Sequence, residues 1–274
     1  MDLPECQQED APEVFTEPEL RVLTVNLAHG RKDGFNQSFQ SGDTARRNIA
    51  EAAEHLERLD ADVIALQEAD APSRWSGNFD HVQAVADAAG YGCQFHGVHA
   101  QGAFYNFGTA LLSRYRFHRA AQHDFEPTPP TTRKGFVAAQ LPWNPAGVLD
   151  EPVMLTLVSL HLDFSRRSTR EAQFAAMTRV LEQFPRPLVV MGDFNTEWES
   201  RGGLLKTFAD NLDLHAWAPA EAGYGTYEGG KKRLDWVLVS REIGFADYAV
   251  IDTVVSDHLP VWAQLRLAST QPER

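Results

Sequence analysis

The chain has 274 residues and a formal net charge of −13, and these values already exclude several classes of protein. Hydrophobic residues make up 43% and charged residues 23%, which is globular composition and excludes a disordered chain or a fibrous repeat. The apolar runs fall far short of the roughly 20 residues of a transmembrane helix, and the acidity excludes indiscriminate coating of nucleic acid.

The two cysteines and the N-terminal residues indicate where the protein resides. Cys6 and Cys93 are too few for a disulfide framework, and this count favours a reducing compartment. Residues 1–15 are acidic and lack the basic and apolar regions of a secretory signal peptide. The sequence therefore predicts a cytoplasmic protein without a membrane anchor.

The acidic residues are concentrated near the N-terminus, where seven of them precede the first basic residue, Arg21. Because three prolines are interspersed among them, residues 1–19 are predicted to form a flexible, solvated leader. Residues 20–268 contain no repeat or long linker and are predicted to form a single catalytic domain. Residues 269–274 are a short polar tail.

The predicted elements are short apolar strands and amphipathic helices. The expected strands are 21–27, 62–67, 93–98, 109–112, 136–141, 153–161, 188–191, 234–239 and 259–267. The expected helices are 43–59, 81–89, 168–184 and 202–211, with Asp43 as an N-cap and with Ser168 and Glu171 as a capping box. Since several strands follow one another directly, a layered α/β sandwich is favoured over a doubly wound parallel fold.

Polar side chains stand where six of these strands begin or end. They are Asn26, Glu68, His161, Asp193 with Asn195, Asp235, and Asp257 with His258. If the strand ends converge, the four carboxylates repel one another and require a cation. Oxygen ligands with imidazole as the nitrogen donor suit Mg²⁺ or Mn²⁺ better than Zn²⁺. His–Asp pairs supply acid–base groups at neutral pH, so the pattern predicts metal-assisted phosphoester hydrolysis.

Six short motifs occur in one order between Arg21 and Leu267: V-N-L, L-Q-E, S-L-H-L, G-D-F-N, R-L-D-W-V-L-V-S and S-D-H-L-P-V. As a set, they resemble the endonuclease/exonuclease/phosphatase superfamily, which includes deoxyribonucleases, exonuclease-III-type repair enzymes, neutral sphingomyelinases and inositol polyphosphate 5-phosphatases. The resemblance implies a four-layer α/β sandwich with two mixed, largely antiparallel sheets flanked by helices. It also implies a metal and phosphate site at one sheet end.

The resemblance implies a metal-binding role for three of these residues. Glu68 matches the principal metal ligand of the family, and Asn26 and Asp257 match its helpers. The implied cofactor is Mg²⁺ or Mn²⁺.

The resemblance implies catalytic roles for the other five residues. Asp193 and Asn195 match the pair that orients the attacking water and holds the phosphate in the transition state. His258 matches the histidine that contacts the scissile phosphate and acts as a base, with Asp235 orienting it. His161 matches a second histidine, which is a candidate acid or phosphate clamp.

Two positions depart from the repair enzymes of the superfamily. Ala28, followed by His29, stands where those enzymes carry an acidic residue after the first asparagine. Asn106, next to Tyr105, stands where they carry a tyrosine. These differences disfavour an abasic-site activity. A surface imidazole and a phosphate contact remain equally good interpretations of His29.

Ten of the 25 basic residues lie in loops beside the motifs: Arg31, Lys32, Arg133, Lys134, Arg166, Arg167, Arg170, Lys231, Lys232 and Arg233. Solvated loop charge is the ordinary interpretation of such residues. A helix that begins near Ser168 also presents its N-terminus to an anion. We therefore predict a basic rim, with Asn106, Arg133, Arg166 and Arg170 as candidate substrate contacts.

Other polar and aromatic residues have structural interpretations of comparable weight. His96 and His99 are expected to be structural or exposed. Trp75, Phe104 and Tyr105 fit a lid over the core slightly better than a platform for bases or lipids.

The residues together favour a Mg²⁺- or Mn²⁺-dependent phosphodiesterase, first of all a DNA nuclease with no protein partner. The alternative is the same chemistry on a phospholipid headgroup, an inositol phosphate or another small phosphoester. A non-catalytic binding module is disfavoured because all of the motif residues are present.

Overall fold

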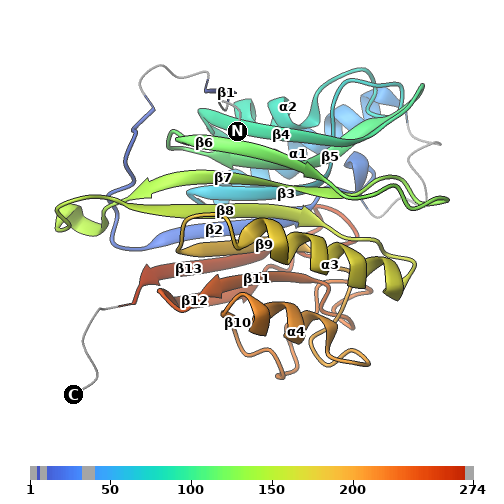
Figure 1. The fold of residues 1–274 in the computed structure, drawn as a ribbon. Helices are drawn as coiled ribbons and strands as arrows, with labels where there is room; N and C mark the ends of the chain where they lie inside the picture. The colour runs from blue at the N-terminus through green and yellow to red at the C-terminus, as the bar shows by residue number, and fades with distance from the viewer. Residues whose placement is uncertain (1–4, 7–10, 33–40, 269–274) are drawn as a thin grey trace.

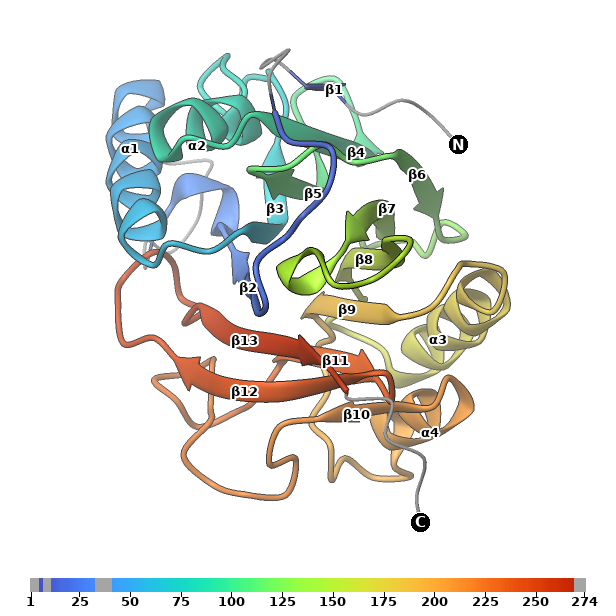
Figure 2. The same ribbon diagram turned by 90° about the vertical axis from the view of Figure 1, so that its left-hand side faces the viewer.

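The computed structural model describes residues 5–6, 11–32 and 41–268, and in it two β-sheets pack face to face (Figures 1 and 2). In the first sheet the strand order is β1 (Glu5–Cys6), β4 (Cys93–Gln101), β5 (Asn106–Ser113), β3 (Val63–Asp70), β2 (Leu20–Asn26), β13 (Val261–Leu267) and β12 (Ile243–Val250). In the second it is β10 (Leu214–Ala216), β11 (Asp235–Ser240), β9 (Leu188–Asp193), β8 (Val153–His161), β7 (Gly135–Trp143) and β6 (Arg119–Asp124).

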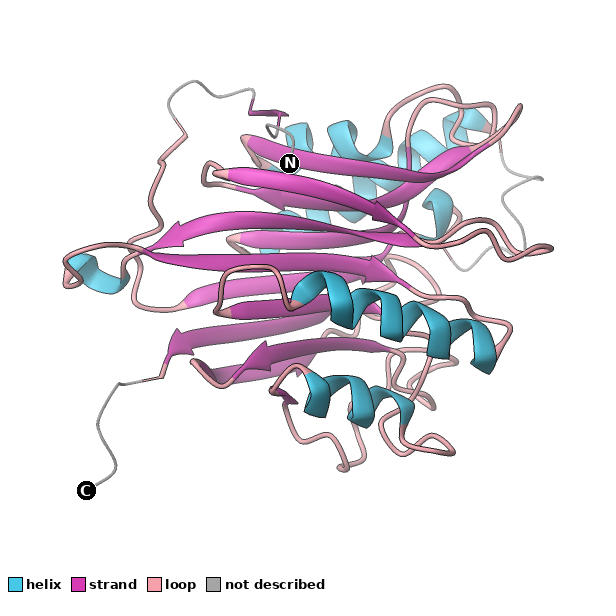
Figure 3. Cartoon of the chain, in the orientation of Figure 1, coloured by secondary structure: helices cyan, strands magenta, loops and turns pink. Residues whose placement is uncertain are grey.

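Helices cover the outer face of each sheet (Figure 3). Helices α1 (Gly42–Arg58) and α2 (His81–Ala89) pack on the first sheet, and α3 (Arg167–Leu181) and α4 (Leu204–Asn211) pack on the second. The result is the predicted four-layer α/β sandwich with mixed sheets. Among the described residues, no helix has both the length and the apolar character that crossing a membrane requires.

The alternation of apolar residues along the strands builds three apolar layers. On β2, Val22 faces the second sheet whereas Leu23 and Val25 face the helices. On β9, Met191 faces the first sheet and Val190 faces α3 and α4. Because successive side chains of a strand point to opposite faces, one apolar layer lies between the sheets and one lies under the helices on each side.

Strand direction brings the functional residues to one edge of the sandwich. Strands β2 and β3 are parallel, as are β8 and β9. Because Asn26 at the end of β2 contacts Asp193 at the end of β9, the ends of all four strands carry their polar residues to the same side. Strand β11 is antiparallel to β9, and its first residue, Asp235, pairs with Asp193, the last residue of β9. His161 pairs with Asp193 from the other neighbouring strand.

The helix N-termini differ from the prediction. Helix α1 is capped by Ser41, whose Oγ accepts a hydrogen bond from the Thr44 amide at 3.2 Å, so Asp43 lies within the first turn rather than at the N-cap. Helix α3 begins at Arg167, and Ser168 is therefore helical rather than part of a capping box. Asp163 instead accepts the amide N–H of Arg166 at 2.8 Å and turns the chain into the helix.

The apolar pattern missed the strands that stand at the edges of the two described sheets: β1, β6, β10 and β12. Strand β12 has only two fully buried residues, Ile243 and Tyr248, among half-buried and exposed ones. An edge strand lacks the continuous burial that makes a central strand visible in the sequence.

The described part of the predicted leader is anchored at Phe15, although Pro12, Glu13, Thr16, Glu17 and Pro18 are exposed as predicted for a solvated segment. The Phe15 ring is fully buried, at 4.8 Å from Tyr115 and 5.9 Å from Trp143, centroid to centroid. Its amide donates to Pro142 O at 2.8 Å. One buried aromatic residue anchors the segment, although its composition is that of a solvated chain. The predicted tail, 269–274, lies outside the described residues.

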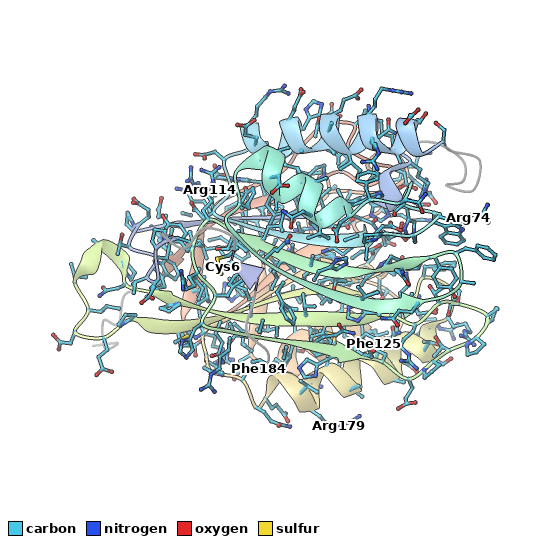
Figure 4. All side chains as sticks on the ribbon, turned by 90° about the horizontal axis from the view of Figure 1, so that it is seen from above. Cys6, Arg74, Arg114, Phe125, Arg179 and Phe184 are labelled. Atoms are coloured by element: carbon cyan, nitrogen blue, oxygen red, sulfur yellow. A yellow bond between two sulfur atoms is a disulfide. The ribbon has the colours of Figure 1, made fainter. Side chains whose placement is uncertain are left out.

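The two cysteines form a disulfide bond between β1 and β4, which corrects the expectation drawn from their number (Figure 4). Cys6 pairs with Cys93 across the two strands, so two cysteines distant in sequence are adjacent in space. The cysteine count therefore does not support a reducing compartment.

Replacing Phe15 tests how firmly this segment is anchored. We expect Phe15→Ala to lower the free energy of unfolding by about 3–5 kcal/mol, because it removes a fully buried ring and leaves a cavity. Val148→Ala is the control: Val148 is 75% exposed, so its truncation changes stability by less than about 0.5 kcal/mol. Urea unfolding of both variants measures the difference. Equal stability of the two would mean that the segment contributes nothing to the fold.

Candidate active site

A cavity of about 480 Å³ opens where the strand ends meet. Among the candidate metal-binding, catalytic and substrate-contact residues, those that line it are Asn26, Glu68, His161, Arg170, Asp193, Asn195, Asp257 and His258. Asp235 lies behind His258 and contacts it directly. The structure thus brings together all of the predicted metal-binding and catalytic residues, which come from both sheets.

Asp193 is the central group of this site. Its Oδ2 accepts a hydrogen bond from Asn26 Nδ2 at 3.2 Å and lies 3.5 Å from His161 Nε2 and 3.9 Å from His258 Nε2. Burial raises the pKa of Asp193 to about 7, Asp235 adds to the rise, and His258 opposes it. The carboxyl group can therefore exchange a proton near neutral pH.

The backbone of the G-D-F-N motif fixes this position. Gly192 has a φ of 143°, and a Cβ at this residue would lie 2.1 Å from Leu160 O, so only glycine fits. Beyond it, the Asn195 amide donates to Asp193 Oδ1 at 2.9 Å, and Asn195 Nδ2 donates to Leu162 O at 3.1 Å. Asn195 itself has a positive φ of 50°, which turns its side chain into the cavity lining.

His258 is oriented by Asp235. The two side chains are 2.8 Å apart through His258 Nδ1 and Asp235 Oδ2, and Thr226 Oγ1 donates to the same oxygen at 2.6 Å. Tyr227 packs against the imidazole, with 4.7 Å between ring centroids. Burial alone lowers the pKa of His258, but the charges of Asp235 and Asp193 outweigh it and raise the pKa to about 10. His258 thus presents a protonated Nε2 to Asp193 and the cavity.

Glu68 enters the cavity from a β-bulge. The register of β3 against β5 shifts between Gln67 and Ala69, and Glu68 adopts a φ of 46°. A bulge of this kind re-aims one side chain at the end of a strand. Burial alone would raise the pKa of Glu68, but the charges of His29 and Lys134 lower it to about 2, so the carboxylate is ionised.

Asp257 and Asn26 complete the set of predicted metal ligands. Asp257 Oδ2 accepts from Arg31 Nη2 at 2.8 Å, and its Oδ1 is buried without a hydrogen-bond partner among the described residues. Ser256 Oγ donates to the backbone oxygen of Asn26 at 2.5 Å, which links the loop before β13 to the end of β2.

The donor set fits a hard divalent cation. Glu68, Asn26 and Asp257 share one cavity and offer oxygen atoms, one of which is buried and lacks a partner within the described chain. Such oxygen ligands are those that Mg²⁺ and Mn²⁺ prefer. A different group, Asp193, Asp235 and His258, has carboxylate and imidazole ligand atoms within 4.8 Å of one another. However, Asp235 Oδ2 in that group is already shared by Thr226 and His258.

One residue of the predicted basic rim is buried in the site instead of lying at its edge. Lys134, at the start of β7, is 6% exposed, and its Nζ lies 3.3 Å from each ring nitrogen of His161. Burial lowers the pKa of Lys134, although the charges of Glu68 and Asp193 oppose this. Burial and Lys134 together hold the pKa of His161 well below its usual value, so His161 is neutral. The strand register could have identified Lys134, because its neighbour Gly135 pairs with His161.

The predicted substrate contacts divide into one that lines the cavity and three that do not. Arg170 lines it, and its Nη1 donates to Asp163 O at 2.8 Å. The other three are not part of the cavity lining within the described residues. Asn106 donates to Pro72 O, and Arg166 donates to Thr128 O. Arg133 pairs with Asp124 at 3.6 Å. Two other residues of the predicted basic rim, Arg31 and Lys232, also line the cavity.

His29, left open by the sequence, is buried rather than on the surface. Its Nδ1 lies 2.7 Å from Asp70 Oδ2, and its Nε2 lies 3.4 Å from Glu68 Oε2. Burial alone would lower the pKa of His29, but the charges of Glu68 and Asp70 raise it. His99, expected to be structural or exposed, is buried and bonded to Asp124 and Thr109.

Comparison with known proteins gives the same family as the sequence motifs. A family model described as the Endonuclease/Exonuclease/phosphatase family matches residues 23–258. A protein of that family from Leptotrichia buccalis is 18% identical over 90% of this chain and 100% of its own, with a TM-score of 0.68. A search of curated proteins found no match.

Two enzymes of known type have the same fold. The catalytic domain of human nocturnin, solved with a bound sulfate anion, is 18% identical over 93% of this chain and 96% of its own, with a TM-score of 0.67. Sphingomyelinase C from Streptomyces griseocarneus is 18% identical over 90% of this chain and 99% of its own, with a TM-score of 0.60. At such identities, the likeness shows the fold alone.

The charge of His258 can be tested in the metal-free protein. Asp235→Asn removes the largest of the charges that raise the pKa of His258, so we expect that pKa to fall from about 10 toward 6.5. Because the folded-state pKa lies above the unfolded value, the ion pair stabilises the wild type fully below pH 6.5. This contribution is lost as the pH rises toward 10.

Two measurements check this expectation. NMR titration of the His258 ring gives its pKa, and urea unfolding at pH 6.5 and about pH 10 gives the stability difference, which should shrink at the higher pH. Asp252→Asn, at an exposed carboxylate, is the control and should leave both unchanged. An unaltered His258 pKa in Asp235→Asn would contradict the role assigned to Asp235.

Proposed function

The chain belongs to the endonuclease/exonuclease/phosphatase family of metal-dependent phosphoester hydrolases, and we propose that it is a Mg²⁺- or Mn²⁺-dependent phosphodiesterase that cleaves DNA. The observation that carries this proposal is the position of Asp193. Its Oδ2 lies within 4 Å of nitrogen atoms of Asn26, His161 and His258, in a cavity that also contains Glu68 and Asp257.

In the proposed reaction, Asp193 orients the attacking water and accepts its proton. Its Oδ1 is engaged by the Asn195 amide, and its Oδ2 is aimed at the space between the two histidines. Asn195 lines the same cavity and is placed to hold a phosphoryl oxygen as charge develops on it.

His258 provides positive charge at the phosphate. Because Asp235 binds its Nδ1, the ring presents Nε2 to the cavity, and the Tyr227 ring restrains its tilt. Fixed donors that stabilise developing charge usually contribute more to the rate of such reactions than any other single effect. On the opposite side, His161 and Lys134 form a second pair that faces Asp193.

Glu68, Asn26 and Asp257 are proposed to hold the divalent cation. When bound, the cation neutralises charge on the phosphate and so favours attack by water. Glu68 is the principal ligand because its carboxylate is ionised and is directed into the cavity by the bulge.

The surroundings of the cavity favour a polymeric phosphodiester. Arg31, Arg170 and Lys232 line it and can contact phosphates on both sides of the scissile bond. Phe164 also lines it and is 65% exposed, which suits stacking on a base. Elsewhere on the surface, Phe104 is 53% exposed beside Arg74, whose guanidinium carbon lies 5.4 Å from the ring centroid.

Replacing His258 tests the catalytic assignment. We expect His258→Asn to lower kcat for cleavage of DNA by about 10²–10³-fold, since it removes a fixed, positively charged donor beside the phosphate. Cleavage of a supercoiled plasmid and of a labelled oligonucleotide, each with Mg²⁺ or Mn²⁺, measures this rate. His118→Asn, at an exposed histidine, is the control and should retain wild-type activity.

The same assays decide between substrates. Absence of cleavage of every nucleic acid tested with either metal would overturn the assignment of DNA. Hydrolysis of bis-p-nitrophenyl phosphate or of phospholipid headgroups, without nuclease activity, would instead identify a smaller phosphoester as the substrate.

Lys134 allows catalysis to be separated from stability. We expect Lys134→Met to lower kcat by about 100-fold, because a positive charge near the phosphate is lost. The melting temperature should stay equal or rise, because the variant no longer buries a charged ammonium group. Lys206→Met, at an exposed residue of α4, is the matched control. Full activity of Lys134→Met would mean that the lysine has no part in the reaction.

A further inference from the structure

His29 occupies a conformation that the backbone adopts at a cost. It lies in η1 (Ala28–Gly30), directly after β2, and both Ala28 and His29 have positive φ values, 46° and 55°. Non-glycine residues in the left-handed region cost of order 1–2 kcal/mol each. The Ala28 amide donates to Asn26 Oδ1 at 2.9 Å, so the turn is attached to a predicted metal ligand. Such strain persists where the surrounding structure requires it.

A buried carboxylate fixes the orientation of the His29 ring. Asp70, at the end of β3, is fully buried, and its Oδ2 lies 2.7 Å from His29 Nδ1. The ring is also held by aromatic neighbours, since the centroid of Phe107 is 4.6 Å and that of Trp75 is 6.2 Å away. Because Nδ1 serves Asp70, Nε2 is the nitrogen that faces Glu68, at 3.4 Å from its Oε2.

Glu68 and Asp70 lie two residues apart on the bulged end of β3 and contact the same imidazole from its two nitrogens. Carboxylates that bind a metal are commonly held by hydrogen-bonding neighbours that fix their orientation, and the Asp70-held imidazole of His29 is placed to be such a neighbour of Glu68. His29 is not part of the cavity lining found among the described residues, whereas Glu68 is. Its position is therefore behind the metal ligand and not against the phosphate.

From this geometry we propose that His29, held by Asp70, is a positioning residue that sets the orientation of the Glu68 carboxylate for the divalent cation. The proposal rests on the proposed function, because it assumes that Glu68 is a metal ligand. It gives a role to His29, for which the sequence left two interpretations open. It also explains why the bulge and the strained turn occur together.

Metal binding tests the proposal without any substrate. The Kd for Mn²⁺ is measured by isothermal titration calorimetry on the full chain for the wild type and the variants His29→Asn, His29→Gln, Asp70→Asn and Glu68→Gln. Loss of partners behind a metal ligand typically weakens metal affinity 10–100-fold. We expect His29→Asn to raise the Kd at least about tenfold, since asparagine can reach Asp70 but not Glu68. His29→Gln, whose amide can reach Glu68, should recover part of the affinity.

His99→Asn is the matched control. His99 is also a buried histidine with an aspartate partner, Asp124, at 2.7 Å. The Kd of the His99→Asn variant for Mn²⁺ should stay within about twofold of that of the wild type. Circular dichroism in EDTA establishes that each variant is folded. If His29→Asn does not fold, His29→Gln and Asp70→Asn decide the question by the same criterion, with Asp70→Asn expected to weaken binding.

The outcomes separate this inference from the proposed function. If Glu68→Gln loses Mn²⁺ binding while the His29 and Asp70 variants stay within about twofold of the wild type, the positioning role is overturned and the metal site stands. If the wild type itself does not bind Mn²⁺, or if Glu68→Gln binds it equally well, the proposed metal site fails and this inference fails with it.

Discussion

The burial of the Asp193 carboxylate between two sheets is the constraint on which the rest of the site depends. A buried carboxylate is costly unless charges and hydrogen-bond donors surround it. Here those groups come from different parts of the chain: Asn26 from β2 in the first sheet, His161 from β8, and His258 from the loop before β13. The two sheets must therefore meet in one register, because a shift of either would leave the carboxylate without partners.

A polar connection beneath the cavity maintains that register. Gln67 Nε2 donates across the sheet interface to Ser159 Oγ at 3.1 Å, and Ser159 Oγ donates to Leu66 O at 3.0 Å. Thr24 Oγ1 donates to Gln67 Oε1 at 3.2 Å, and all of these side chains are fully buried. In an otherwise apolar interface, such bonds have fixed geometry, and their satisfaction selects one alignment of the sheets. The cavity residues are attached one or two positions beyond these bonds.

The sequence predicted the layered fold and the residues of the cavity because both have a local signature. Central strands such as β8 and β9 appear as apolar runs, and His161 and Asp193 stand at their ends, so strand direction alone places them together. The sequence could not show which charges become buried. Lys134 and Arg133 are equivalent as neighbours in a loop, yet one enters the site and the other pairs with Asp124 at the surface. Which of these two side chains enters the site depends on the residue at which β7 begins.

The sequence also could not predict the structure of segments whose contacts are distant along the chain. Phe15 was counted within an acidic leader because composition averages over a segment, whereas one aromatic side chain that finds Trp143 is enough to fix its backbone. Cys6 and Cys93 likewise are adjacent only because β1 pairs with β4. Long-range pairing of this kind requires knowledge of the strand order, which periodicity does not contain.

The net charge of −13 illustrates how little a total says about a site. What a bound phosphate encounters is set by charges within a few ångströms, because more distant exposed charges are screened by salt. Around the cavity, the acidic side chains are engaged: Asp257 by Arg31, Asp235 by His258, and Glu68 by His29. Lys134, Arg170 and Lys232 lie close to them, so an anion meets cationic groups in an acidic protein. The acidity of the rest of the surface then acts against nonspecific binding of polyanions.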